Sequence, residues 1–227
     1  LIYQLLQSAG LPAALGGNIG HAFSRLVLED LKQAKAGRIY VVETSSFQLE
    51  NIDNFRPKIA LLLNITPDHL DRYEYKLENY AQAKFQITKN QGAGDYFIFN
   101  AADPVIQKYR KNTVFPAEIN AGIEQVNYEN GILHVDGNLR FDLAKTKIRG
   151  PHNYFNALCA IKAALMLGAG PENIQEGLNA FTPPAHRLEV VATMEGVTYI
   201  NDSKATNVDA VFYALQAMEQ PTVWIVG

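Results

Sequence analysis

The sequence predicts an α/β protein built on a mostly parallel sheet. Short apolar runs end abruptly at polar residues and alternate with segments whose apolar residues recur at helical spacing. Runs at 38–42, 59–63 and 95–99 predict strands. The run Ile59–Leu63 is apolar throughout, which is typical of a strand that is buried on both faces. The alternation of these runs with helical segments favours parallel strands joined by crossover helices.

The composition fits a protein with a sizeable core. Of 227 residues, 48% are hydrophobic and 19% are charged, and the net charge of -3 argues against nucleic acid as a partner. The single cysteine, Cys159, excludes an internal disulfide framework and is predicted to be a small buried side chain. No apolar run approaches the roughly 18 residues of a membrane helix, and no signal peptide is visible. We therefore expect a cytoplasmic protein without a membrane partner. We also expect a monomer, although none of these observations bears on the oligomeric state.

Both ends of the chain interrupt a predicted element. The first residue, Leu1, lies in a segment predicted to be helical, because Leu1, Leu5, Leu6 and Ala9 share one face. The last residue, Gly227, directly follows a strand-like run at 223–226. We therefore expect a piece of a longer enzyme.

A glycine-rich loop, Gly16–Gly20, follows the apolar run Leu11–Leu15 and leads into a helix predicted at 21–36. The inner side of this helix is expected to hold Phe23, Leu26, Val27, Leu31 and Ala34. The backbone N–H groups of such a loop can cradle an anion, but a tight turn that requires glycine explains the loop equally well. Both interpretations stay open.

Polar side chains follow two of the predicted strands. Glu43 comes directly after one strand, and the pair Asp68-His69 follows the next. Thr66 and Pro67 are predicted to be the N-cap and the first residue of a helix. Because ligands bind at the carboxyl ends of the strands in open α/β sheets, we expect these side chains to form a site.

One charged residue, Lys84, lies on the apolar side of the next predicted helix, 77–90. The apolar face of that helix consists of Leu77, Tyr80, Ala81, Phe85 and Thr88. A lysine near the middle of this face either extends its amine to the domain edge or belongs to a polar site in apolar surroundings. The second interpretation is the one we favour.

The segment 113–143 predicts a different kind of structure. It follows a turn and helix predicted at 100–109 and consists of short alternating runs. Turn signals at Asn130-Gly131 and Asp136-Gly137 separate these runs, which predicts a small antiparallel sheet.

Two helices are predicted next, at 152–167 and 172–180, and Thr182–Pro184 is a candidate linker. Asn153 and Asn156 lie close to one face of the first helix. Asn153 fits a cap or a first-turn residue, whereas Asn156, a poor residue for a helix interior, is a better candidate for a binding role.

A second α/β unit is predicted after the linker. Its elements are strands at 188–193 and 197–201, a helix at 208–218 and a strand at 223–226. Asp202, Lys204 and Thr206 lie in the strand-to-helix loop and suit ribose, phosphate and carboxylate groups respectively. We expect two domains, 1–184 and 185–227.

These motifs resemble the Mur ligase family, in order and over almost the whole chain. They are GGNIG at 16–20, ETSSFQL at 43–49, NITPDHLDRY at 64–73, YAQAK at 80–84, GPHNYFNAL at 150–158, His186-Arg187 and NDSKATN at 201–207. Several are weak individually, but together they are highly specific. SSFQL and DSKATN indicate the branch of the family that adds D-glutamate.

The resemblance implies the nature of the two domains. Residues 1–184 would be a central P-loop-type ATPase domain without its start, and 185–227 would open a Rossmann-like domain. The G-x-x-G-K-[ST] loop of the family is expected shortly before Leu1. We therefore expect this chain alone not to turn over ATP.

The resemblance also implies a reaction of peptidoglycan precursor synthesis. ATP phosphorylates the carboxylate of UDP-N-acetylmuramoyl-L-alanine, and the amine of D-glutamate then displaces phosphate from the acyl phosphate. Mg²⁺ is the implied cofactor, because these charged states require a metal ion and fixed donors.

The implied magnesium ligands are Glu43, His69 and Lys84, the last as a carbamate formed with carbon dioxide. The preference of Mg²⁺ for oxygen would favour Asp68, but we follow the resemblance and expect His69. The implied catalytic residues are Lys84, His69 and Lys204.

Substrate contacts implied by the resemblance come from both domains. The expected ATP-binding residues are Asn156, His152, Arg187 and Asp202. The expected contacts to the uridine nucleotide are Asn18, Ser45 and Gln48, and Thr206 is expected near the incoming amino acid.

Alternative interpretations stay open. A sibling Mur ligase or a folylpolyglutamate-synthase-like enzyme would differ at the DSKATN loop. A non-catalytic nucleotide-sugar-binding module would lack the phosphate-binding lysine, and a purely structural polar network would need Lys84 for stability alone.

Overall fold

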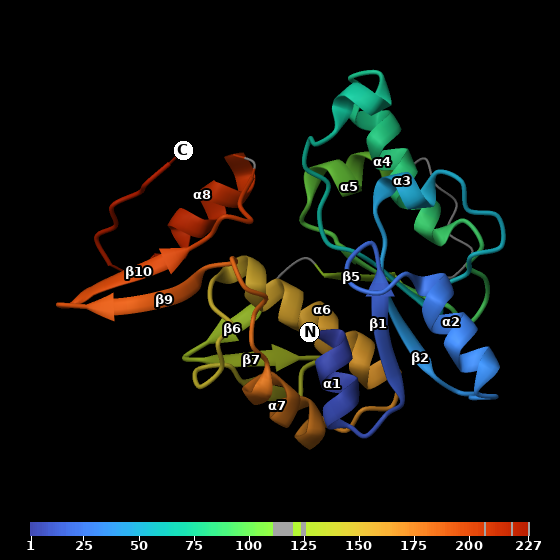
Figure 1. Cartoon of the computed structure of the whole chain (residues 1–227), viewed down its shortest axis with the longest axis horizontal. Helices are drawn as coiled ribbons and strands as arrows, with labels where there is room; N and C mark the ends of the chain where they lie inside the picture. The colour runs from blue at the N-terminus through green and yellow to red at the C-terminus, as the bar shows by residue number, and fades with distance from the viewer. Residues whose placement is uncertain (111–119, 124–125, 207, 219, 227) are drawn as a thin grey trace.

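The computed structural model describes residues 1–110, 120–123, 126–206, 208–218 and 220–226. Figure 1 shows a larger α/β body with a smaller unit at its side, which the C-terminal segment forms from two strands and a helix. Parallel strands and a separate small antiparallel sheet are both present, so the predicted fold class is confirmed.

The first two strands form a parallel pair. β1 (Ala13–Gly17) and β2 (Ile39–Glu43) run in register from Ala13 opposite Ile39 to Gly17 opposite Glu43, and α2 (Phe23–Lys32) connects them. Their carboxyl ends therefore lie side by side.

A second parallel sheet has the order β3 (Ile59–Leu62), β4 (Tyr96–Asn100) and β5 (Asn120–Ile123). One face packs against α4 (Leu77–Phe85) and α5 (Pro104–Arg110). The buried side chains on this face are Ala60, Leu62, Phe97 and Phe99, together with Tyr80, Phe85 and Ile106. On the other face, Ile59, Leu61 and Ile98 join a different core cluster. The sheet is thus buried on both faces, as the apolar run predicts.

Three further strands form the predicted antiparallel sheet, β6 (Asn127–Glu129), β7 (Ile132–Val135) and β8 (Leu139–Asp142), with the two predicted turns between them. This sheet packs against the helices α6 (Pro151–Met166) and α7 (Pro171–Ala180). One part of the segment 113–143, which we expected to be antiparallel, differs from the prediction: β5 joins the parallel sheet. Residues 111–119 and 124–125 lie outside the described residues.

Short helical elements complete the body. They are α1 (Ile2–Ser8), α3 (Ser46–Leu49), η1 (Leu70–Tyr73) and η2 (Gln86–Thr88). The helix α1 packs against α6 and α7, and its Leu5 and Leu6 are fully buried. The helix predicted at the start of the chain is therefore confirmed, with Ile2 as its first residue and Leu1 as its N-cap.

The C-terminal unit consists of the hairpin β9 (Glu189–Met194) and β10 (Val197–Asn201), followed by α8 (Val208–Gln216). It contacts the start of α6, where the rings of His152 and Tyr213 lie 5.6 Å apart. The domain boundary after residue 184 stays a prediction.

The prediction that a helix begins at Thr66 and Pro67 is wrong. Residues 63–68 have no regular structure, and the next helical turn is η1, with His69 as its N-cap. His69 has φ 51° and ψ 30°, a left-handed conformation that interrupts a right-handed helix, and its N–H donates to Asp68 Oδ1 at 2.9 Å. Such short-range hydrogen bonds of aspartate compete with helix formation.

The strand predicted at 223–226 is also wrong. A strand requires a hydrogen-bonded neighbour, and no strand within the described ranges pairs with this run. Val223 and Ile225 are 90% and 89% exposed.

The inner face predicted for the helix at 21–36 does not extend to Leu31 and Ala34. Leu31 is 73% exposed, because α2 covers only the two-stranded sheet and buries Leu26 and Asp30 there. The helix also ends earlier than expected, at Lys32, and Ala34 has a positive φ of 50°.

Every helix in the described part of the chain is too short or too polar to cross a membrane.

Gly177 permits the close contact between α1 and α7. A Cβ at this position would lie 2.9 Å from Leu5 Cδ2 and 3.1 Å from Leu5 Cα. We expect Gly177→Val to lower the free energy of unfolding by about 2 kcal/mol, because overpacking forces well-packed neighbours to move. Urea unfolding followed by circular dichroism measures this change.

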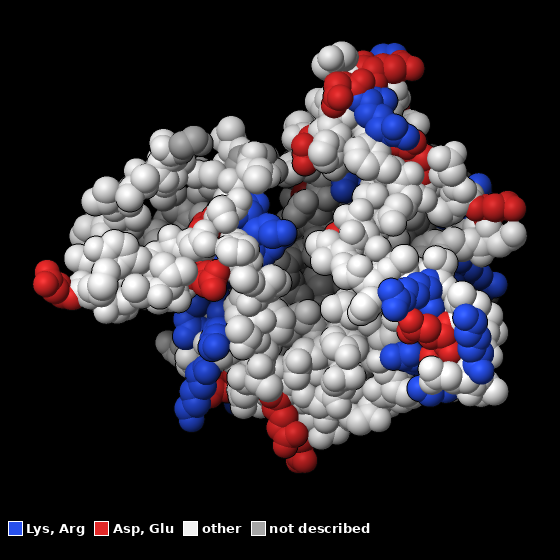
Figure 2. Space-filling view, in the orientation of Figure 1, with Lys and Arg blue, Asp and Glu red and all other residues white. Residues whose placement is uncertain are grey.

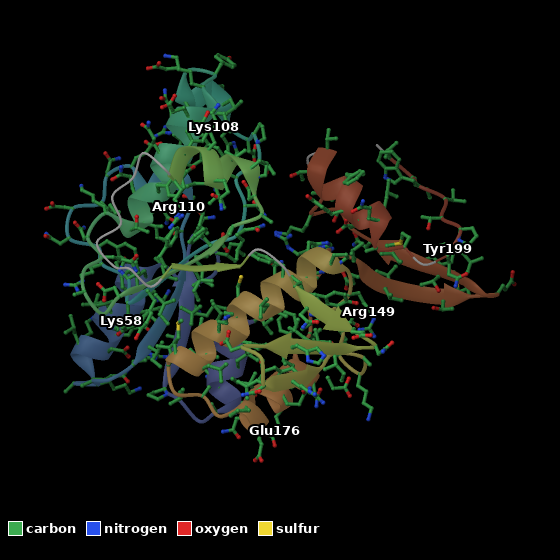
Figure 3. The ribbon with its side chains drawn as sticks, turned by 180° about the vertical axis from the view of Figure 1, so that it is seen from behind. Lys58, Lys108, Arg110, Arg149, Glu176 and Tyr199 are labelled. Atoms are coloured by element: carbon green, nitrogen blue, oxygen red, sulfur yellow. The ribbon has the colours of Figure 1, made fainter. Side chains whose placement is uncertain are left out.

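The matched control for this substitution is Glu176→Val. Glu176 is the preceding residue of the same helix and points away from the body of the protein (Figure 3). Its replacement introduces the same β-branched side chain with an expected change within roughly 0.5 kcal/mol. Equal losses in the two variants would contradict the packing argument.

Candidate active site

Asn18 and Glu43 lie together at the carboxyl ends of β1 and β2. The N–H of Asn18 donates to the Glu43 carbonyl at 2.8 Å, and its Nδ2 donates to Glu43 Oε1 at 3.3 Å. Gly17 has φ 114°, and a Cβ there would collide with the Glu43 carbonyl oxygen. Glycine is therefore required for the close approach of this loop to β2, which explains one residue of the GGNIG motif by backbone geometry.

Ser45 and Gln48 form a capping box on α3. The N–H of Gln48 donates to Ser45 Oγ at 3.3 Å, and the N–H of Ser45 donates to Gln48 Oε1 at 3.0 Å. Such reciprocal bonds satisfy N–H groups that a helix start leaves unpaired. In this structure, Ser45 and Gln48, two of the predicted substrate contacts, thus stabilise a four-residue helix directly after the end of β2.

Asp68 and His69 follow β3 in an irregular segment. The Asp68 carboxylate holds the His69 N–H, and its Oδ2 lies 3.7 Å from His69 Nε2. The His69 ring is half exposed, and its centroid lies 5.2 Å from that of Phe47 on α3. His69, which follows β3, is thus in contact with α3, the helix that follows β2.

Lys84 lies on the inward side of α4, as predicted. Its side chain is half-buried, and Nζ lies 4.8 Å from the ring centroid of Tyr80, one turn earlier in the helix. Burial lowers the pKa of the Lys84 amine below its usual value, and the negative charge of Asp68 partly offsets this. Burial, together with the same carboxylate, raises the pKa of Tyr80 to about 12. The structure therefore places Asp68, Tyr80 and Lys84 in one electrostatic environment.

The donor set of the described residues does not by itself form a metal site. Within the described ranges, no three histidine, cysteine, aspartate or glutamate side chains are arranged to hold a metal ion. Mg²⁺ binds oxygen ligands in near-octahedral geometry. A magnesium site that uses Glu43 and His69 therefore requires a further oxygen ligand.

His152 and Asp202 interact electrostatically across the contact between the body and the C-terminal unit. Burial lowers the pKa of His152, and the negative charge of Asp202 partly offsets this. Asn156 is half-buried and lies one turn after His152 on α6. Two predicted ATP-binding residues from different predicted domains thus lie within electrostatic range of each other.

The loop with Asp202 is tied to the segment that begins the C-terminal unit. Asp202 Oδ1 accepts from the Leu188 N–H at 3.0 Å, and the Lys204 N–H donates to the His186 carbonyl at 3.1 Å. The side chains of Arg187, Lys204 and Thr206 are exposed. The backbone of this loop is thus held by hydrogen bonds, while the side chains of Arg187, Lys204 and Thr206 remain accessible.

Figure 2 shows the surface hollowed between the side of the body that carries α3, α4 and α5 and the C-terminal unit. The start of α6 lies at the contact with that unit, beside α8. A separate depression of about 530 Å³ lies on another face of α4 and is lined by Glu50, Arg72, Tyr73, Glu74, Asn79, Gln82, Ala83 and Gln86. We do not assign this second depression to the site, because Lys84 does not line it.

Sequence reasoning missed the aromatic partners of the site. Tyr80 was expected only as a core residue, although its position four residues before Lys84 allows a cation–π contact. Phe47 was not singled out within its motif, and neither was Tyr213, which contacts His152. Only Tyr80 could have been found from local spacing.

Comparisons with known sequences support one family. The sequence profile described as the Mur ligase middle domain matches residues 1–164. The UDP-N-acetylmuramoylalanine--D-glutamate ligase of Christiangramia forsetii is 43% identical over 237 aligned positions, which cover 100% of this chain and 52% of the relative. The ligase of the same name from Bacteroides fragilis is 41% identical over 236 positions, with the same coverage. The chain thus spans about half the length of these curated relatives.

The fold is also found among solved structures. The MurF ligase from Thermotoga maritima in complex with ADP has a TM-score of 0.69 and 15% sequence identity, and the match covers 95% of this chain and 52% of that chain. At this identity, the likeness concerns the fold alone.

The electrostatic link between Asp68 and Lys84 can be tested directly. Because the Asp68 charge raises the pKa of Lys84, we expect Asp68→Asn to lower that pKa further. NMR titration of ¹³C-labelled lysine side chains measures the shift. Asp71→Asn, which removes an exposed acid from the following helical turn, should leave the Lys84 pKa unchanged. An unchanged Lys84 pKa in Asp68→Asn would show that the two groups do not interact.

Proposed function

Because the chain belongs to the Mur ligase family, we propose that its protein is an ATP-dependent ligase that joins D-glutamate to UDP-N-acetylmuramoyl-L-alanine. The observation that carries this proposal is the high identity, along the entire chain, to curated relatives with that ligase name. The proposed protein acts as a monomer, and its parts are a central ATPase domain at 1–184 and the start of a further ligase domain at 185–227.

The proposed reaction has two steps. The γ-phosphoryl group of ATP moves to the carboxylate of the alanyl residue, which yields an acyl phosphate and ADP. The amine of D-glutamate then attacks the acyl carbon, the C–N bond forms, and phosphate leaves while the amine loses a proton. Activation of the carboxylate is needed because a free carboxylate oxygen is a poor leaving group.

The substrate side of the site is proposed to use the loop after β1 and the helix α3. Asn18 lies beside Glu43, and Ser45 and Gln48 lie at the start of α3. These residues surround the strand end at which a ligand of an open α/β sheet binds, which supports a role in holding the uridine nucleotide.

The nucleotide side is proposed to use α6 and the loop of the C-terminal unit. His152 and Asn156 would contact ATP from α6, and Arg187 and Asp202 would contact its phosphate and ribose groups. The closeness of His152 to Asp202 supports a nucleotide site between these elements. Lys204 and Thr206, both exposed in the same loop, would act on the reacting groups and on the incoming amino acid.

Glu43, His69 and Lys84 are proposed to hold magnesium, Lys84 as its carbamate. When bound, Mg²⁺ would stabilise the negative charge of the phosphoryl and acyl oxygens. The lowered pKa of Lys84 supports this role, because only the neutral amine adds to carbon dioxide, with loss of one proton. The carbamate would replace a half-buried cation by an anion with two oxygen ligands. Asp68, which lies near Lys84, is the further candidate ligand.

Substrate specificity tests the proposed function. We expect the complete protein to release phosphate from ATP in the presence of UDP-N-acetylmuramoyl-L-alanine and D-glutamate. L-Lysine and L-alanine should not replace D-glutamate. A phosphate-release assay with a panel of amino acids measures this, and activity with L-lysine or L-alanine but not with D-glutamate would refute the assignment.

Lys84→Ala tests the carbamate. We expect kcat to fall roughly 100-fold, the scale on which loss of a charge-stabilising group acts. Added acetate or formate should restore part of the activity, because a short carboxylate can occupy the place of the carbamate. The unfolding midpoint in urea should not fall, since the substitution removes a half-buried charge.

The control for this variant is Lys76→Ala, which removes an exposed lysine that pairs with Glu74 just before α4. Its activity should equal that of the wild type with or without carboxylate. If Lys84→Ala loses stability while retaining activity, the lysine has only a structural role.

A further inference from the structure

A row of aromatic rings connects the segment that carries His69 with the helix that carries Lys84. Phe47 lies 5.2 Å from the His69 ring and 6.2 Å from the Tyr73 ring, with an interplanar angle of 1° to Tyr73. Tyr73 lies 5.2 Å from Tyr80. Lys84 Nζ then lies 4.8 Å from the Tyr80 ring centroid. The row therefore spans α3, η1 and α4.

Among the residues that the structure describes, none forms a hydrogen bond with the His69 ring. Asp68 Oδ2, the carboxylate oxygen nearest its Nε2, is 3.7 Å away, which is too far for a hydrogen bond. The His69 backbone has a left-handed conformation and its N–H donates to the Asp68 side chain, but neither feature fixes the ring about χ1 and χ2. The orientation of the imidazole therefore depends on the surface against which it packs.

Phe47 is a rigid surface for that purpose. The Arg72 guanidinium lies 4.9 Å from its ring centroid, and Arg72 is itself held by a double hydrogen bond to Glu50, at 3.2 and 2.9 Å. Tyr73 is buried in the core. Phe47 is thus fixed by two neighbours from η1 and presents its ring to a third, His69.

A purely structural role does not explain Phe47. Its side chain is 37% exposed, whereas the next apolar residue of α3, Leu49, is buried. A phenylalanine that stays partly in water gains only part of the stabilisation that full burial gives. Within the described ranges, its ring contacts are with His69, Tyr73 and Arg72.

From these contacts we propose that Phe47 is a positioning residue, which orients the His69 imidazole and, through Tyr73 and Tyr80, sets its place relative to Lys84. The inference that Phe47 affects catalysis rests on the proposed function, in which His69 and Lys84 act at one centre. The inference that Phe47 orients the His69 ring rests on the contacts alone.

Phe47→Leu in the complete protein tests the proposal by two independent measurements. The first is the ¹³C–¹H signal of the His69 ring in protein labelled at histidine Cε1, assigned with His69→Gln. Loss of the neighbouring ring current should move this signal toward the position of an exposed histidine. The second is steady-state kinetics, in which kcat should fall roughly tenfold through misplacement of His69, with KM for ATP unchanged.

Two further variants separate positioning from general loss of packing. Phe47→Tyr keeps the ring and should retain both the His69 signal and kcat. Phe55→Leu removes a comparable aromatic contact, with Phe23 at 6.4 Å, at a different place in the fold, and should leave both quantities unchanged.

The outcomes are distinct. An unmoved His69 signal in Phe47→Leu overturns the proposal, whatever the kinetics show. A moved signal with unchanged kcat overturns the catalytic part of it, and so does a rise in KM without a change in kcat, which would make Phe47 a substrate contact. If the wild-type protein shows no ligase activity, the proposed function fails, while the ring signal still decides whether Phe47 orients His69.

Discussion

The burial of the β3–β4–β5 sheet on both faces determines where this protein can place polar groups. Ala60, Leu62, Phe97 and Phe99 fill one face, and Ile59, Leu61 and Ile98 fill the other, so neither face can take an unpaired charge without a large desolvation cost. Polar side chains therefore collect after the strands end. Asp68 and His69 follow β3, and Glu43 ends β2, whose Ile39 and Val41 pack against the same cluster as Ile59 and Leu61.

Lys84 is the exception to this arrangement, and its surroundings show how the exception is tolerated. The amine lies against the face of Tyr80 and within the field of Asp68, and both interactions favour its cationic form. Burial outweighs the carboxylate, since the pKa of the amine is lowered. A half-buried lysine with a weakened hold on its proton is a reactive amine, which links the packing of α4 to the proposed chemistry.

Much of the fold could be predicted because its signals are local. Apolar runs located β2, β3 and β4, and helical periodicity located α1 and α4. Glycine and proline residues at their starts located α6 and α7, and Asn130-Gly131 and Asp136-Gly137 located the antiparallel turns. The inward position of Lys84 also followed from spacing within one helix. The predictions were wrong where a side-chain hydrogen bond or the pairing of strands decides the structure instead of such signals. The Asp68 hydrogen bond replaced a helix start at Thr66 by an irregular segment. The apolar run at 223–226 did not become a strand, because no strand in the described part of the chain pairs with it.

By itself, the sequence determined the fold class, the order of most elements and the set of residues that match the Mur ligase motifs. These properties depend on residues close together in the chain, and hydrophobic periodicity and turn residues report them directly. Only the tertiary structure decided which of those residues meet. The contacts of Asn18 with Glu43 and of Phe47 with His69, and the electrostatic interaction of His152 with Asp202, join segments that are 22 to 50 positions apart in the chain. Such contacts depend on how sheets and helices pack, and no pattern within one segment contains that information.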